Sequence, residues 1–131
     1  MIADQQSASR PSHKTHRDLV TWRNSMQLLV QVYRVARQLP DVERYGLAAQ
    51  LRRAAVSIPA NIAEGFGRST RGDYLRHLSI ASGSLRELET HLEAITLLEY
   101  LPEAGIEAAA DAARRTGFLL YRLQRSLFPR G

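Results

Sequence analysis

Four long segments of the chain repeat apolar residues at the spacing of an amphipathic α-helix. In the first, apolar side chains recur at alternating steps of three and four residues, which places them along one side of a helix over residues 18–38. This seam consists of Leu19, Trp22, Met26, Leu29, Tyr33 and Ala36, widened by Val32, Val35 and Leu39. Pro40 ends the helix, because the residue before a proline is pushed out of the helical region.

The second segment predicts a helix over residues 44–66 that contains a proline. Its apolar positions are Leu47, Leu51, Ala54 or Ala55, Ile58, Ile62 and Phe66. Pro59 removes one backbone hydrogen bond from the helix interior, so we expect a bend over residues 55–59. Because the apolar spacing resumes in phase after the proline, we expect one bent helix and not two. Gly65 and Gly67 are expected to end it in a left-handed cap.

The third and fourth segments predict helices over residues 70–99 and 103–127. The third is expected to begin at a Ser69 or Thr70 cap. Its seam consists of Tyr74, Leu78, Ala81, Leu85, Leu88, Leu92 and Ile95. The fourth has a seam of Ile106, Ala110, Ala113, Gly117, Leu120, Gln124 and Leu127. Because the first half of the fourth segment is rich in alanine, we expect looser packing there.

Four helices with short connections and no strand pattern predict an all-α fold, an antiparallel up-down four-helix bundle. We expect the bundle to span residues 17–131 as a single domain. Residues 1–16 contain almost no apolar side chains, so we expect them to form a disordered N-terminal tail.

Composition narrows the chemistry that the chain can support. The chain has 131 residues and no cysteine, which excludes disulfides, thiolate metal sites and a thiol nucleophile. It has no apolar run long enough to cross a membrane and no secretory signal at its start, so we expect a cytoplasmic protein without a membrane partner. Glu87 and His91 lie four residues apart with no second pair to face them, and no glycine-rich phosphate loop follows a strand. We therefore expect neither a metal site nor a cofactor.

Charge is unevenly distributed along the chain. Lys and Arg number 18 against 13 Asp and Glu, a net charge of +5 that suits a polyanionic partner. Residues 87–111 carry seven acidic residues and no Lys or Arg, whereas residues 112–131 carry five arginines and no acid. Two interpretations are open: the acidic segment pairs with basic segments of its own bundle, or it meets the basic surface of a second copy. A heterologous contact of the second kind closes into a ring.

Two sequence blocks resemble a known family. Residues 50–68 read QLRRAAVSIPANIAEGFGR and residues 78–92 read LSIASGSLRELETHL. They resemble the 23S rRNA intervening-sequence proteins, a family of bacterial four-helix bundles, and the similarity extends over residues 18–101. His91 departs from the pattern, where glutamine is expected. The resemblance implies a ring-shaped homo-oligomer, with a pentamer favoured, and an association with RNA. More distantly, the chain is similar to basic accessory proteins of the reverse transcriptases of diversity-generating retroelements.

A polar cluster accompanies the proline of the second helix. Ser57, Asn61 and Glu64 are spaced so that they lie in a line on one face, beside Pro59. The structural interpretation is a hydrogen-bonded cluster that satisfies the carbonyl freed near Ala55 and holds this helix against the third. The functional alternative is a small polar pocket or a subunit contact.

Arginines supply the candidate nucleic-acid-binding residues. One patch surrounds the second helix and the turn that follows it, and consists of Arg52, Arg53, Arg68, Arg71 and Arg76. We expect all of these except Arg53 to converge at one end of the bundle, where the start of the third helix adds its positive dipole. A second patch on the fourth helix consists of Arg114, Arg115, Arg122 and Arg125. The alternative for both is ion pairing with acidic neighbours. The sequence shows no helix-turn-helix, zinc finger or aromatic stacking platform, so we expect little sequence specificity.

These observations favour a non-catalytic protein that binds RNA or a ribonucleoprotein through arginine–phosphate contacts. The main alternative is an interaction module that docks a larger protein, such as a reverse transcriptase. A third hypothesis is an endoribonuclease similar to the HEPN proteins, which would use Arg71 with His77, or Arg86 with His91. This third hypothesis requires the histidine to lie in an exposed groove beside its arginine.

Overall fold

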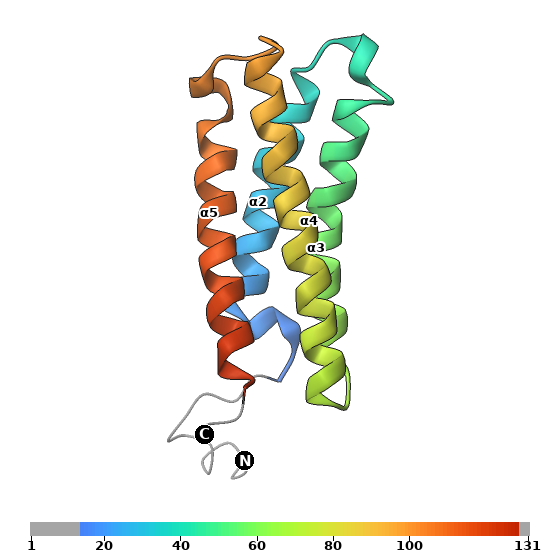
Figure 1. The fold of residues 1–131 in the computed structure, drawn as a ribbon, viewed down its shortest axis with the longest axis vertical. Coiled ribbons are helices and arrows are strands. Elements are labelled where there is room, and N and C mark those ends of the chain that lie inside the picture. Colours follow the sequence, from blue (N-terminus) through green and yellow to red (C-terminus); the bar gives the residue numbers. More distant parts are fainter. Residues whose placement is uncertain (1–13, 129–131) are drawn as a thin grey trace.

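The computed structural model describes residues 14–128 and contains four long helices (Figure 1). These are α2 (Val20–Arg37), α3 (Leu47–Phe66), α4 (Arg71–Leu97) and α5 (Glu103–Ser126), with short 3₁₀ turns η2 (His16–Asp18) and η3 (Asp41–Glu43). No strand occurs within residues 14–128, so the prediction of an all-α fold with four helices is confirmed. Most of the predicted N-terminal tail, residues 1–13, lies outside the described residues.

Consecutive helices run in opposite directions, as an up-down bundle requires (Figure 1). Each helix packs against two neighbours: α2 and α4 each contact both α3 and α5. The lower end in Figure 1, here called the α3–α4 end, holds the start of α2, the turn between α3 and α4, and the end of α5. The upper end, here called the α2–α3 end, holds the other two connections.

The core confirms the predicted seams of α3 and α4 more fully than that of α2. Leu51, Ile58 and Ile62 of α3 are fully buried, and so are most seam residues of α4. On α2, by contrast, Met26 is 37% exposed. The buried face of α2 is Thr21, Asn24, Ser25, Leu28, Val32, Val35 and Ala36. The side of α2 that faces the core is therefore rotated about the helix axis from the side that the sequence predicted.

Hydrogen bonds explain why polar residues of α2 are buried in place of Met26. Asn24 Nδ2 donates to Thr116 Oγ1 of α5 at 2.8 Å, and Ser25 Oγ donates to the Trp22 carbonyl at 2.7 Å. Burial of a polar group costs little when the group is bonded, and among the described residues no buried side-chain nitrogen or oxygen lacks a partner. The core face of α5 is shifted in a similar way: Thr116 and Ala109 are buried, where the sequence predicted Gly117 and Ala110.

The boundaries of α3 and α4 correct two details of the sequence analysis. α3 begins at Leu47 and not at residue 44, because Glu43 Oε1 accepts the Leu47 backbone N–H at 2.8 Å and caps the helix from the preceding turn. α3 runs unbroken through Pro59, as predicted, while the bend there stays a prediction. The left-handed glycine cap is wrong, since Gly67 has a φ of −82°. The predicted Thr70 cap of α4 is confirmed: its side chain accepts from Asp73 N at 3.1 Å.

Packing is more open along part of the contact between α4 and α5. One open pocket lies between the second half of α4 and the alanine-rich start of α5, over Leu92, Ile106 and Ala110, and a second adjoins it along α5. The prediction of looser packing there agrees with these pockets. Over the described range, no helix combines the length and apolar character needed to cross a bilayer.

Candidate nucleic-acid interface

The bundle is polarised in charge from end to end. The antiparallel arrangement brings basic residues of three helices to the α3–α4 end (Figure 1). They are Lys14, Arg17, Arg23, Arg68, Arg71, Arg76, Arg122 and Arg125, accompanied by the acids Asp18, Glu64 and Asp73. The α2–α3 end gathers Asp41, Glu43, Glu93, Glu99, Glu103 and Glu107, together with Arg34, Arg37 and Arg44. A polyanion would therefore be attracted to the α3–α4 end.

Three arginines of the first predicted patch lie together at this end, and two do not. Arg68, Arg71 and Arg76 flank the turn between α3 and α4. Arg52 lies fourteen residues before the last residue of α3, which is about 21 Å along an unbroken helix. Its Nη2 reaches back to the Arg44 carbonyl at 3.5 Å, and Arg53 donates to Gln50 Oε1 at 2.9 Å. The predicted convergence of Arg52 with the others is therefore wrong, because α3 runs unbroken from Arg52 to Phe66 and the length of the helix keeps them apart.

The three clustered arginines remain accessible. Arg68 pairs with Glu64 at 2.5 Å and Arg76 approaches Asp73 at 3.9 Å, with side chains that stay 42% and 59% exposed. Arg71 has no side-chain partner among residues 14–128. Exposed ion pairs contribute only about 0–1 kcal/mol and are screened by salt, so they compete weakly with a phosphate. The cluster also lies at the start of α4, where free backbone N–H groups and the helix dipole favour an anion.

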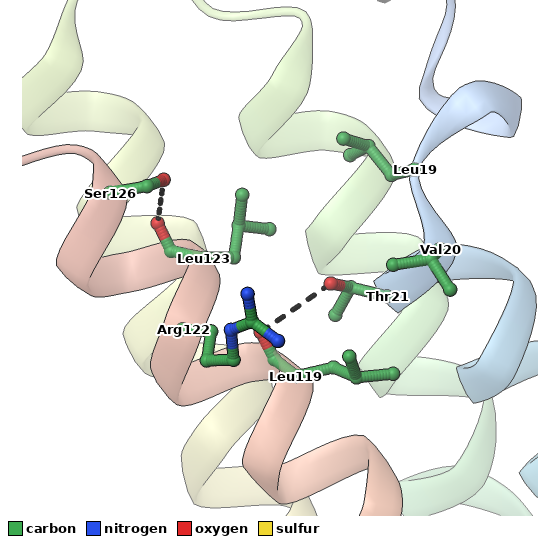
Figure 2. A pocket seen from close by; sticks show the side chains of 7 residues that line it. All are labelled: Leu19, Val20, Thr21, Leu119, Arg122, Leu123 and Ser126. Carbon is green, nitrogen blue, oxygen red and sulfur yellow. Dashed lines mark hydrogen bonds between the residues drawn. The ribbon is translucent and has the colours of Figure 1, made fainter.

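The second predicted patch divides along α5. Arg114 pairs with Asp111 in the middle of the helix. Arg115 and Arg125 have no side-chain partner in the part of the chain that the structure describes. Arg122 lies 5.6 Å above the ring centroid of Phe118 and also borders an open pocket between α2 and α5. In Figure 2, its guanidinium lies at this pocket, among side chains from the start of α2 and the end of α5.

Sequence reasoning missed an aromatic surface beside this second patch. Phe118, Tyr121 and Phe128 are 59%, 60% and 55% exposed. The sequence analysis expected no aromatic surface on which bases could stack, and it did not anticipate that these three rings are exposed. Their signal in the sequence is a position off the α5 seam: Phe118 and Tyr121 lie two residues before and one residue after Leu120, which is buried.

The predicted polar cluster forms and joins α3 to α4. Asn61 Nδ2 donates to the Ser57 carbonyl at 2.9 Å, and Ser57 Oγ shares a hydrogen bond of 2.7 Å with Ser84 Oγ of α4. Asn61 Oδ1 lies 3.1 Å from His77 Nδ1, and His77 Nε2 lies 4.0 Å from Glu64 Oε2. The Asn61 amide thus contacts Ser57 and His77, and not the carbonyl near residue 55 as the sequence analysis expected. These contacts favour the structural interpretation, and Ser84 and His77 of α4 are the members that the sequence analysis did not include.

The same contacts bear on the ribonuclease hypothesis. His77 is 5% exposed and held by Asn61, while Arg71 lies at the surface. His91 is engaged with Glu87 at 3.4 Å, and Arg86 pairs with Glu89 at 3.0 Å. The condition that this hypothesis sets, an exposed histidine beside its arginine in one groove, is thus not met by His77. Within the described ranges, no three His, Asp or Glu side chains gather as metal ligands.

The charges of the four helices are not paired across the bundle. From α2 to α5, every ion pair joins residues three or four positions apart, except that of His77 with Glu64. The carboxylates of Glu93, Glu103 and Glu107 have no partner among the residues described. The acidic half of α4 runs beside the acidic start of α5. The interpretation in which it pairs with basic segments of its own bundle is therefore not supported.

Comparisons with known proteins give a family for the chain and a solved structure of similar fold. The family model described as 23S rRNA-intervening sequence protein matches residues 17–122. A crystal structure of a protein of unknown function from the S23 ribosomal protein family of Bacteroides thetaiotaomicron VPI-5482 superposes with a TM-score of 0.74. It shares 24% sequence identity, and the alignment covers 80% of this chain and 98% of the other, which shows that the two share a fold. No curated protein matches the chain.

Proposed function

Because the chain belongs to the 23S rRNA-intervening sequence protein family, we propose that it is a non-catalytic cytoplasmic protein that binds RNA or a ribonucleoprotein. The observation that carries this proposal is the arginine cluster at the α3–α4 end. Arg68, Arg71 and Arg76 flank the positive end of α4, and within residues 14–128 their ion pairs are exposed ones. Guanidinium groups bind phosphate through paired hydrogen bonds, so this end is suited to an RNA backbone.

Binding of this kind has a recognisable dependence on salt. Each phosphate that the protein neutralises releases condensed counterions, so the logarithm of the affinity falls linearly with the logarithm of the salt concentration. Contacts to phosphates carry no sequence information, so strands of different sequence should bind alike through this cluster.

A salt series of RNA binding, followed by fluorescence anisotropy, tests the proposal. We expect the Arg68→Gln, Arg71→Gln, Arg76→Gln triple variant to bind more weakly and to lose about two units of salt slope on single strands, at about 0.7 per phosphate. The matched control changes Arg34, Arg44 and Arg86 to glutamine, which removes the same charge away from the α3–α4 end and leaves the proposed subunit contact untouched. Equal losses in both variants would mean that net charge and not the cluster carries binding. A folded protein that binds no RNA at low salt would refute the proposal and favour a larger protein partner.

We further propose that the protein assembles head to tail as a ring-shaped homo-oligomer, with a pentamer favoured. The groove between α4 and α5 has an apolar floor of Leu92, Ile106 and Ala110 and is lined by acids, among them Glu93 and Glu107. The outward sides of α2 and α3 carry the complementary features: Val30 and Val56 are exposed and apolar, and Arg37 and Arg52 lie within one or two helical turns of them. A heterologous contact between these surfaces would pair charges that the bundle leaves unpaired.

Light scattering of the protein tests the assembly. We expect an oligomer whose mass falls when Glu93 and Glu107 are both changed to glutamine, because the acidic lining of the groove is then weakened. The control variant Asp41→Asn removes an exposed acid outside the groove and should leave the mass unchanged. A monomer at all concentrations would contradict the ring.

A further inference from the structure

The outward side of the second half of α5 combines two features that a soluble bundle usually keeps apart. Phe118, Tyr121 and Phe128 are each more than half exposed, although large aromatic side chains normally bury most of their surface. Three arginines, Arg115, Arg122 and Arg125, lie among them on α5, and Phe128 follows just past the end of the helix. We call these six residues the aromatic–arginine strip. Exposed apolar clusters of this kind mark interaction sites.

The spacing of the strip makes it a continuous surface. Arg115, Phe118, Arg122 and Arg125 follow at steps of three, four and three residues, so they share one side of α5. The guanidinium of Arg122 lies over the Phe118 ring, 5.6 Å from its centroid. Residues 115–128 contain no Asp or Glu, so every formal charge that this segment itself carries is positive.

We propose that the aromatic–arginine strip binds single-stranded RNA, with unpaired bases stacked on Phe118 and Tyr121 and phosphates held by the arginines. This inference rests on the proposed function and adds to it the class of RNA that is bound. Aromatic rings and guanidinium planes both stack on exposed bases, and such stacking tolerates any base because every base has a π-face. A ring system set among arginines is what this mode of binding requires.

The position of the strip favours RNA over a second copy of the chain. The end of α5 reaches the α3–α4 end of the bundle, where Arg68, Arg71 and Arg76 lie (Figure 1). A strand could therefore continue from the strip onto that cluster. The acidic groove that suits a subunit contact lies on the first half of α5, from Glu103 to Arg114, whereas the strip lies on the second half and just past its end.

The strip distinguishes single strands from duplexes. Bases in a duplex are already stacked on one another and cannot reach the rings, whereas unpaired bases can splay onto them. Phosphate contacts at the α3–α4 end make no such distinction. The two contributions can therefore be separated by the choice of RNA.

Three fluorescent RNA probes test the proposal with the full-length protein: a short oligoadenylate, a strand of the same length with abasic sites, and a duplex. The test variant is Phe118→Ala with Tyr121→Ala. The control variant is Tyr45→Ala, which removes a ring that is 86% exposed at the α2–α3 end. Circular dichroism and light scattering check the fold and the mass of each variant.

We expect the double variant to bind oligoadenylate at least about tenfold more weakly, in line with the known cost of removing a base–aromatic stack. Its affinity for the abasic strand and for the duplex should be unchanged, and Tyr45→Ala should behave as wild type on all three probes. Equal binding of oligoadenylate by the double variant and wild type would overturn the stacking inference while leaving phosphate binding intact. A fall in oligomer mass in the double variant would identify the rings as a subunit contact and overturn it as well. Absence of binding to all three probes by the wild type would refute the proposed function itself.

Discussion

Changing Thr116 to valine should destabilise the fold by removing one hydroxyl from the contact between α2 and α5. Thr116 is fully buried; its Oγ1 accepts from Asn24 Nδ2 at 2.8 Å and donates to the Ala112 carbonyl at 2.8 Å. Valine has nearly the same shape, so packing is kept, but Asn24 Nδ2 is left with only the contact of 3.4 Å to the Ala112 carbonyl. A buried polar group that loses its partner costs about 1–3 kcal/mol, and we expect the free energy of unfolding to fall by that amount.

A second change separates the hydrogen bond from the packing around it. Asn24→Leu alone should cost less than Thr116→Val, because the Thr116 hydroxyl keeps its bond to the Ala112 carbonyl. In the double variant both polar groups are gone, and an apolar pair of similar size in a buried site is close to neutral. We therefore expect the double variant to recover to within about 1 kcal/mol of wild type, a strong positive coupling.

Urea unfolding of all four proteins, followed by far-ultraviolet circular dichroism at one protein concentration, measures these differences. The slope of the transition checks that the unfolded state is the same in each. The reasoning is refuted if Thr116→Val lies within about 0.5 kcal/mol of wild type, the range of an ordinary surface change. It is equally refuted if the losses of the two single variants simply add in the double variant.

Two further changes test close packing and pH dependence. A Cβ at Gly65 would lie 2.9 Å from the Cβ of His77, so Gly65→Ala should lower the free energy of unfolding, measured in urea, by about 1–3 kcal/mol. Gly83→Ala, at an open helical position, should instead raise it by about 0.5–1 kcal/mol. A Gly65→Ala variant more stable than Gly83→Ala would contradict the close contact. Hydrogen bonds from the Leu47 backbone and the Tyr100 hydroxyl lower the pKa of Glu43 from its usual 4.5. The two bonds therefore stabilise the folded state at pH values above 4.5, and this stabilisation is lost as the pH falls through the lowered pKa. Tyr100→Phe should therefore be less stable than wild type at neutral pH, and thermal unfolding should show the difference shrinking in acid; a difference independent of pH would contradict the role of Glu43.

The sequence predicted α3 and α4 well because their apolar residues and their buried residues are the same set. Leu51, Ile58 and Leu85 belong to both the periodic pattern and the core. On α2 the two sets diverge, because Asn24 is buried through a hydrogen bond to a residue 92 positions away. No local pattern contains that partner, so periodicity assigned Met26 to the core in its place. Tertiary hydrogen bonds are thus the reason that one predicted seam was turned from its true face.

The candidate site shows the same division between local and distant information. That Arg68, Arg71 and Arg76 lie together follows from their closeness in sequence, and the sequence predicted it. The separation of Arg52 from them was also within reach of the sequence, because the single helix predicted through Pro59 already places Arg52 about 21 Å from the end of α3. The aromatic–arginine strip depends on which side of α5 faces the core, which Thr116 and Asn24 decide. The buried pair of Asn24 and Thr116 therefore fixes the side of α5 that faces the core, and with it the side on which Phe118 and Tyr121 are exposed.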